Sequence, residues 1–221
     1  CFFAKKRYLF RKRVAFMKFE VTEADCFALC RQAPEFLPVV EQVGPLEGFE
    51  CIGDLFYALV QSIISQQLAV KAAAAIFQRV EIHLGKITAE SLLSAAFDDL
   101  RSCGLSGRKI EYLRGIADAK ISGTIDFESL AMLPDAEVIK ELVKLKGVGV
   151  WTAEMLLLFA LGRPDVLSFH DLGIRRGIIL LNGLAQLSAR EFEYFRRRYS
   201  PYGSLASLYL WQMKDGGLCV R

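Results

Sequence analysis

The stretch from Leu145 to Gly177 holds two features that could do chemistry, a turn rich in glycine and a lone carboxylate. The letters KGVG place Gly147 and Gly149 between two segments with helical apolar spacing, DAEVIKELVKL and VWTAEMLLLFALG. This order predicts a helix-hairpin-helix. Glycines let another backbone come close, and the first amides of the second helix carry the positive end of its dipole. The turn therefore suits a phosphate of a nucleic-acid backbone, although tight helix connections also use glycine for steric reasons alone.

The carboxylate is Asp171, which stands at the start of the predicted helix LGIRRGIILL, about twenty residues after the hairpin. Aspartate is a favourable residue before the first helical turn, because its side chain accepts a hydrogen bond from a backbone N–H of that turn. Its spacing alone therefore favours a helix cap over a catalytic group.

The elements that position these groups are predicted to be helices. Thr22, Thr88 and Ser188 precede helical segments as caps do. Strand-like alternation is scarce, and apolar residues recur at helical spacing in most of the chain, for example at Phe56, Leu59, Val60, Ile63 and Ile64. We expect an all-α fold of about a dozen short helices.

Composition limits the classes of protein. The 221 residues are 53% hydrophobic, enough for a substantial core, but no apolar run is long enough to cross a bilayer, so no membrane role is expected. Six of the 28 basic residues precede Met17, which leaves 22 basic against 25 acidic residues from there on. Net charge therefore gives no argument for nucleic acid. We interpret residues 1–16 as an extension before a natural start at Met17, with a functional basic arm as the alternative.

The six cysteines show no metal-binding or disulfide pattern. They stand at positions 1, 26, 30, 51, 103 and 219, without a CxxC pair, and the only histidines are His83 and His170. This spacing predicts reduced, mostly buried thiols in a cytosolic protein.

Four segments together resemble the helix-hairpin-helix (HhH-GPD) DNA glycosylase superfamily, and within it the short alkyladenine group that lacks an N-terminal β domain. Besides the hairpin with Asp171, they are FYALVQSIISQQLAVKAAAAIF, GLSGRKIEYLRGIA and YSPYGSLASLYLWQM, and the resemblance begins near Gly53. It implies a two-lobed helical fold with DNA and the active site in the cleft between lobes. The central lobe is expected at 54–162, and the second lobe at 17–53 and 163–221.

The resemblance also implies roles for residues of the active site. Asp171 matches the essential carboxylate, which would stabilise oxocarbenium character at C1′ when the base leaves. Trp151 stands where the bifunctional branch has a lysine nucleophile, so no AP lyase activity is expected. Trp151, Met155 and Trp211 would line a pocket in which indole faces attract a cationic alkylated purine, whereas composition alone favours ordinary core tryptophans. His170 is grouped with this base pocket, as a residue that lines the cleft or faces solvent rather than a general base.

Further residues are implied to contact DNA. Gln67 matches the wedge that fills the gap left by a flipped nucleotide, with Leu68 beside it; an isolated glutamine at a helix end would otherwise be read as exposed surface. The expected contacts to the DNA backbone are Lys146, Gly147, Gly149 and Thr152. A monovalent cation bridging to the phosphate could bind the carbonyls of Val143, Leu145 and Val148.

The resulting hypothesis is a monofunctional glycosylase that removes alkylated purines of the 3-methyladenine type from double-stranded DNA and so starts base excision repair. We expect it to act as a monomer in the cytoplasm, at the bacterial nucleoid. One alternative is a non-catalytic DNA-binding module that uses only the hairpin. Another is a glycosylase for oxidised or mismatched bases with an iron–sulfur cluster, but that branch has four closely spaced C-terminal cysteines and only Cys219 lies in this region.

Overall fold

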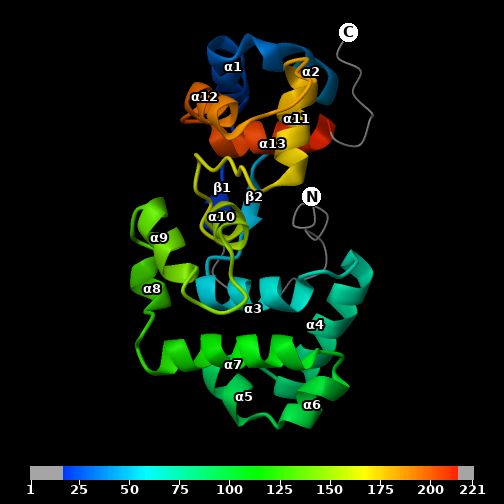
Figure 1. Cartoon of the computed structure of the whole chain (residues 1–221), viewed down its shortest axis with the longest axis vertical. Helices are drawn as coiled ribbons and strands as arrows, with labels where there is room; N and C mark the ends of the chain where they lie inside the picture. The colour runs from blue at the N-terminus through cyan, green and yellow to red at the C-terminus, as the bar shows by residue number, and fades with distance from the viewer. Residues whose placement is uncertain (1–16, 214–221) are drawn as a thin grey trace. The chain divides into compact units, whose positions relative to one another are not determined.

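The computed structural model describes residues 17–213, so the predicted extension at 1–16 and Cys219 lie outside the described part. Within that part the protein is mostly helical, with one small antiparallel sheet of two strands (Figure 1). The predicted all-α class is therefore confirmed, and the short sheet is an addition to it. None of the described helices combines the length and apolar character needed to cross a membrane.

The elements follow one another in this order: β1 (Met17–Phe19), α1 (Glu23–Gln32), the 3-10 helix η2 (Pro34–Phe36), α2 (Leu37–Val43), β2 (Phe49–Cys51), α3 (Leu55–Ser65), α4 (Val70–Leu84), α5 (Ala89–Ser94), α6 (Phe97–Ser102), α7 (Gly107–Ile121), α8 (Phe127–Leu130), α9 (Asp135–Leu142), α10 (Val150–Phe159), α11 (Leu172–Leu181), α12 (Ala189–Tyr199) and α13 (Gly203–Met213).

The described chain divides into two compact units. The first unit combines residues 17–51 with residues 157–213, and the second unit consists of residues 52–156. The first unit is therefore built from two segments that are distant in sequence, and the second lies between them in the chain.

In the first unit, close packing of α11 on α13 depends on a residue without a side chain. A Cβ on Gly177 would lie 2.7 Å from both the Cβ and the carbonyl oxygen of Leu210, closer than real Cβ contacts come. The two strands pair from Met17 opposite Cys51 to Phe19 opposite Phe49. The N-terminal segment and the C-terminal helices are joined by Tyr209 on α13, whose hydroxyl hydrogen-bonds the thiol of Cys26 and the carbonyl oxygen of Gly44, each at 3.2 Å.

In the second unit, α3 is the central helix, because all but one of its residues are buried. One long helix, α7, packs against α3 and also against α5 and α6, which lie on the opposite side of it (Figure 1). The edge-on contact of Phe56 with Phe127 joins α3 to α8, with ring centroids 5.5 Å apart. This contact fixes α8, the helix that precedes the predicted hairpin.

Local signals for helix starts are confirmed. Thr22, Thr88 and Ser188 each cap a helix through the side-chain oxygen, and each forms a reciprocal capping box with the third helical residue. The four described cysteines are free and buried, as predicted: Cys26, Cys30, Cys51 and Cys103. Burial raises the pKa of the Cys51 thiol, which keeps it protonated and unreactive.

Candidate functional site

Asp171 is a buried carboxylate fixed from two directions in the first unit. Its Oδ1 accepts a hydrogen bond from the backbone N–H of Ile174 at 2.9 Å and caps α11, as the sequence predicts. The same oxygen accepts a second bond, 3.0 Å long, from the indole Nε1–H of Trp211 on α13. Only 7% of the residue is exposed. The positive end of the α11 dipole and two donors thus hold one negative group in a set orientation.

Trp211, which contacts this carboxylate, is itself packed among other side chains. Its ring lies nearly parallel to that of Phe159, with centroids 5.7 Å apart and an interplanar angle of 16°. The side chain is buried. The family resemblance implies that Trp211 recognises a base through its face. In the structure Phe159 stacks on the indole, and the ring nitrogen of Trp211 donates to Asp171. The second contact was missed because the two residues lie 40 positions apart.

Gly173 leaves the space that this contact needs. A Cβ at this position would lie 2.8 Å from Cδ1 of Trp211 and 3.0 Å from Oδ1 of Asp171. Any larger residue would push the indole or the carboxylate aside. The sequence does carry a signal for this role, because Gly173 and Gly177 stand four residues apart in a helix, where glycine is unfavourable unless close packing requires it.

His170 precedes this carboxylate and is exposed. Its ring contacts Phe169 edge-on, with centroids 5.8 Å apart. The structure therefore places His170 at the surface, and its place in the base pocket stays a prediction.

The second unit contains the helix-hairpin-helix. Helix α9 ends at Leu142, three residues before the end of the predicted helical segment, and α10 begins at Val150. The turn between them is closed by hydrogen bonds from the backbone N–H of Leu145 to the carbonyl of Leu142 and from that of Val148 to the carbonyl of Leu145. The predicted motif is therefore present, with a turn longer than the four letters KGVG.

The two hairpin glycines are needed for different reasons. Gly147 has a φ of 87°, and a Cβ there would lie 2.3 Å from Cδ2 of Tyr112 on α7, so its requirement is internal. Gly149 is exposed and has no atom within 4 Å of where its Cβ would be. Only Gly149 therefore fits the expectation of a glycine that leaves room for a partner. Lys146, between α9 and Gly147, is exposed.

The first turns of α10 carry the remaining predicted pocket residues. Trp151 is half-buried, whereas Thr152 and Met155 are buried. The side chain of Thr152 therefore faces the protein interior, which leaves its backbone amide for the predicted DNA contact. Trp151 and Met155 are four residues apart and so share one face of the helix.

The predicted wedge follows the end of α3. Gln67 is exposed and has a φ of 57°, the only positive φ at a non-glycine residue in the described part of the chain. Leu68 is half-buried. An L-residue in this left-handed region is uncommon, and such a residue persists only where its surroundings hold it.

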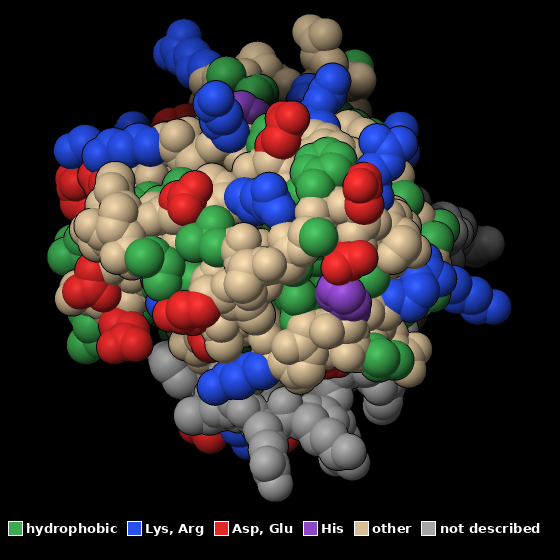
Figure 2. Space-filling view, turned by 90° about the horizontal axis from the view of Figure 1, so that it is seen from below, with side chains coloured by type: hydrophobic (Ala, Val, Ile, Leu, Met, Phe, Trp, Pro, Cys, Tyr) green, Lys and Arg blue, Asp and Glu red, His purple; other side chains and the backbone are tan. Residues whose placement is uncertain are grey.

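Among the described residues, one face of the molecule shows no broad positive patch that could replace the hairpin (Figure 2). On the face seen in Figure 2, Lys and Arg are interspersed with Asp and Glu, and neither sign forms a continuous patch. Sequence-independent binding to phosphate by backbone amides needs no such patch.

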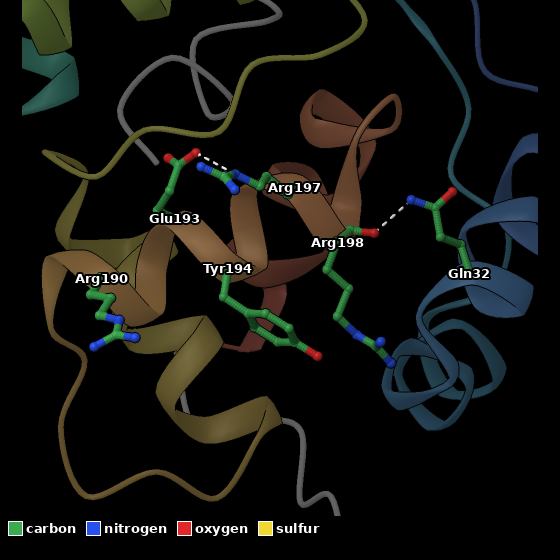
Figure 3. Close-up of a pocket in the computed structure, with 6 residues that line it drawn as sticks. All are labelled: Gln32, Arg190, Glu193, Tyr194, Arg197 and Arg198. Atoms are coloured by element: carbon green, nitrogen blue, oxygen red, sulfur yellow. Dashed lines mark hydrogen bonds and ion pairs between the residues drawn. The ribbon is translucent and has the colours of Figure 1, made fainter.

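One open cavity of about 710 Å³ lies elsewhere in the first unit (Figure 3). It contains none of the predicted site residues, and two of its three arginines are already engaged. Arg197 pairs with Glu193 at 2.9 Å, and Arg198 binds both carboxylate oxygens of Glu35 at 2.7 and 2.8 Å. Its lining is Gln32, Arg190, Glu193, Tyr194, Arg197 and Arg198. We therefore interpret this cavity as a surface depression beside α12 that is not part of the candidate site.

The helical fold, the hairpin and the oriented aspartate at a helix start are the features on which the family resemblance of the sequence rests. The chain matches the HhH-GPD superfamily of base excision DNA repair proteins over residues 60–201 and belongs to that family. The DNA-3-methyladenine glycosylase 1 of Schizosaccharomyces pombe is 39% identical over 159 residues, which are 70% of each chain. Two further curated relatives are matched over only 58% and 45% of their own length.

Solved structures agree with this assignment. A DNA-3-methyladenine glycosidase from Bacillus halodurans superposes with a TM-score of 0.77 at 34% identity, covering 91% of this chain and 93% of that one. The S. pombe 3-methyladenine DNA glycosylase Mag1, solved in complex with abasic DNA, gives a TM-score of 0.71 at 34% identity over 82% of this chain and 91% of its own.

Proposed function

We propose that the protein hydrolyses the N-glycosidic bond of alkylated purines in double-stranded DNA, as a monofunctional glycosylase of the DNA-3-methyladenine type. The observation that carries this proposal is the second hydrogen bond to Asp171. Capping α11 requires only the bond from Ile174, whereas the bond from Trp211 fixes the carboxylate beyond what a cap needs. The similarity to named 3-methyladenine glycosylases supports the same reaction.

The reaction follows from the charge of the substrate. A purine alkylated at N3 or N7 is cationic, so its bond to C1′ breaks with the electron pair moving onto the base nitrogen, and the base leaves neutral. The sugar is left with oxocarbenium character, which an oriented carboxylate such as Asp171 stabilises. Water then adds to C1′ and gives up a proton to solvent, which leaves an abasic site.

Trp151 supports the monofunctional assignment, because an indole has no amine to attack C1′. In our proposal its face and the neighbouring Met155 receive the flipped cationic base by stacking and cation–π attraction. Gln67 and Leu68 fill the gap in the duplex, and the amides of the hairpin contact the phosphates.

The partner in this proposal is double-stranded DNA that contains an alkylated base, bound by a monomer at the bacterial nucleoid in the cytoplasm. A solved relative bound to abasic DNA supports DNA as the partner. This hydrolysis requires no iron–sulfur cluster. The carbonyls of Val143, Leu145 and Val148 lie in one turn and offer the hard oxygen ligands that suit a monovalent cation, which would help to hold a phosphate there.

The deciding experiment is release of free base from duplex DNA treated with a methylating agent, followed by chromatography. We expect N3-methyladenine among the products, and no covalent adduct when borohydride is added during the reaction. DNA binding without release of any base would overturn the proposed activity and leave a non-catalytic binding protein. A trapped adduct would overturn only the monofunctional part.

A further inference from the structure

The exposed residue Gln67 follows Gln66, and both the backbone and the side chain of Gln66 are fixed by hydrogen bonds within the second unit. Helix α3 ends at Ser65, and its last carbonyls lack the intrahelical partners that further turns would supply. Gln66 follows as the C-cap, and Gln67 then takes its φ of 57°. What fixes Gln66 therefore fixes the start of the wedge.

Lys109 on α7 is the first of these contacts. Its Nζ donates hydrogen bonds to the carbonyl oxygens of Ile64 and Gln66, both at 2.8 Å. A lysine at the carboxyl end of a helix satisfies free carbonyls and complements the negative end of the dipole. Burial also lowers the pKa of Lys109, because its ammonium group is partly removed from water.

The side chain of Gln66 is the second contact. Its Nε2 donates to the carbonyl oxygen of Gly147 at 3.0 Å, which ties the wedge segment directly to the hairpin. The ring of Tyr112 also packs against Gly147. Lys109 and Tyr112 are three residues apart on α7, so one face of this helix supports both segments.

We propose that Lys109 and Gln66 are positioning residues that hold the Gln67 wedge at a set place relative to the hairpin. The group that fills the gap in the duplex and the amides that bind the phosphates are then held in one rigid arrangement. The segment that carries Gln67 does not need to become ordered when DNA binds. This inference rests on the proposed function, because it concerns how the same protein keeps a nucleotide flipped. Neither residue contacts the base or the sugar in this account.

The test compares two duplexes under single-turnover conditions with enzyme in excess. In one, N3-methyladenine or another excised lesion stands opposite a normal base; in the other, it stands opposite an abasic site, where flipping requires less unstacking and unpairing. We expect Lys109→Met to slow excision from the paired duplex by about tenfold and from the second duplex by about twofold at most. Gln66→Leu, which keeps the side-chain bulk but loses the donor, should show the same pattern.

The control variant is Lys140→Met, which removes one exposed lysine of α9 that pairs only with Glu137 in the described structure. It should match the wild type on both duplexes. Thermal unfolding of each variant shows whether a loss reflects folding; if Lys109→Met does not fold, Gln66→Leu decides the question. In a Gln67→Ala background, either substitution should cause no further loss, because a positioning residue acts only through the group that it positions.

Equal losses on both duplexes, or a full further loss in the Gln67→Ala background, would overturn the positioning role. Unchanged excision by folded Lys109→Met and Gln66→Leu would do the same. These outcomes are distinct from failure of the proposed function, in which the wild-type protein itself releases no base from either duplex.

Discussion

Replacing Trp211 with phenylalanine separates the two roles that this residue can have. The change removes the indole N–H that donates to Asp171 and leaves an aromatic ring next to Phe159. Asp171 keeps its bond from the Ile174 amide and so still caps α11. If Trp211 acts by orienting the carboxylate, excision should fall although the pocket keeps an aromatic face.

The size of the effect follows from the lost bond. A hydrogen bond to a charged group contributes roughly 1.5–3 kcal/mol, and about 1.4 kcal/mol corresponds to a factor of ten in rate. Loss of the Trp211 donor should therefore slow excision by about tenfold to a hundredfold. Because the carboxylate acts on the sugar, the loss should be equal for cationic N3-methyladenine and for a neutral lesion such as hypoxanthine, provided the wild type removes both.

The assay is single-turnover release of each base from a defined duplex, with two companion variants. Tyr209→Phe removes another buried hydrogen-bonding group from the same helix, one that bonds Cys26 and Gly44 and not Asp171, so it controls for a general loss of stability. Gly173→Ala keeps the indole but puts a Cβ only 2.8 Å from Cδ1 of Trp211. It should displace the ring and also slow excision. Rates within about twofold of wild type for Trp211→Phe would refute the orienting role, and a loss confined to cationic bases would assign Trp211 to base recognition by its face.

Three other predictions follow from the described contacts. Asp171→Asn should keep the α11 cap and DNA affinity while excision falls at least about a hundredfold, measured by base release; near-normal excision would leave the residue as a cap only. Gly147→Ala should lower the free energy of unfolding by about 1–3 kcal/mol because of Tyr112, whereas Gly149→Ala should leave the thermal midpoint unchanged and weaken binding to undamaged duplex in fluorescence anisotropy; the reverse pattern would contradict the assignment. Burial opposes ionisation of Glu35, but its hydrogen bonds from Arg198 prevail and lower its pKa, so the stability that this pair contributes is present at neutral pH and is lost as the pH falls below about 4.3, the ordinary value for glutamate. The melting temperatures of wild type and Glu35→Gln should therefore converge on acidification, and a gap independent of pH would exclude this linkage.

The features that the sequence predicts correctly are those decided by near neighbours. Thr22, Thr88 and Ser188 cap helices through residues three positions away, and the hairpin is marked by glycines between two apolar helical patterns. The capping role of Asp171 is local in the same way. Its assignment as a catalytic group came from the family resemblance, since spacing alone cannot separate the two roles.

The features that it misses depend on residues far apart in the chain. The strands β1 and β2 are three residues each, and only their pairing across thirty or more positions makes them a sheet. The bond from Trp211 to Asp171 and the ties that hold Gln66 join separate helices in the same manner. Such contacts produce no periodic pattern in the sequence. The two glycines of α11 are only an indirect sign of close packing there.

The two-segment construction of the first unit sets an order for its folding during synthesis. The hydroxyl of Tyr209 on α13 bonds the carbonyl of Gly44 and the thiol of Cys26, which precede it by 165 and 183 residues. At a translation rate of about 5–20 residues per second, the early segment waits on the order of ten seconds or longer for this partner. Residues 52–156 are complete in the meantime and can fold first. Ribosome-bound chains cut short before α13 should therefore show protease protection in the second unit and none in the first.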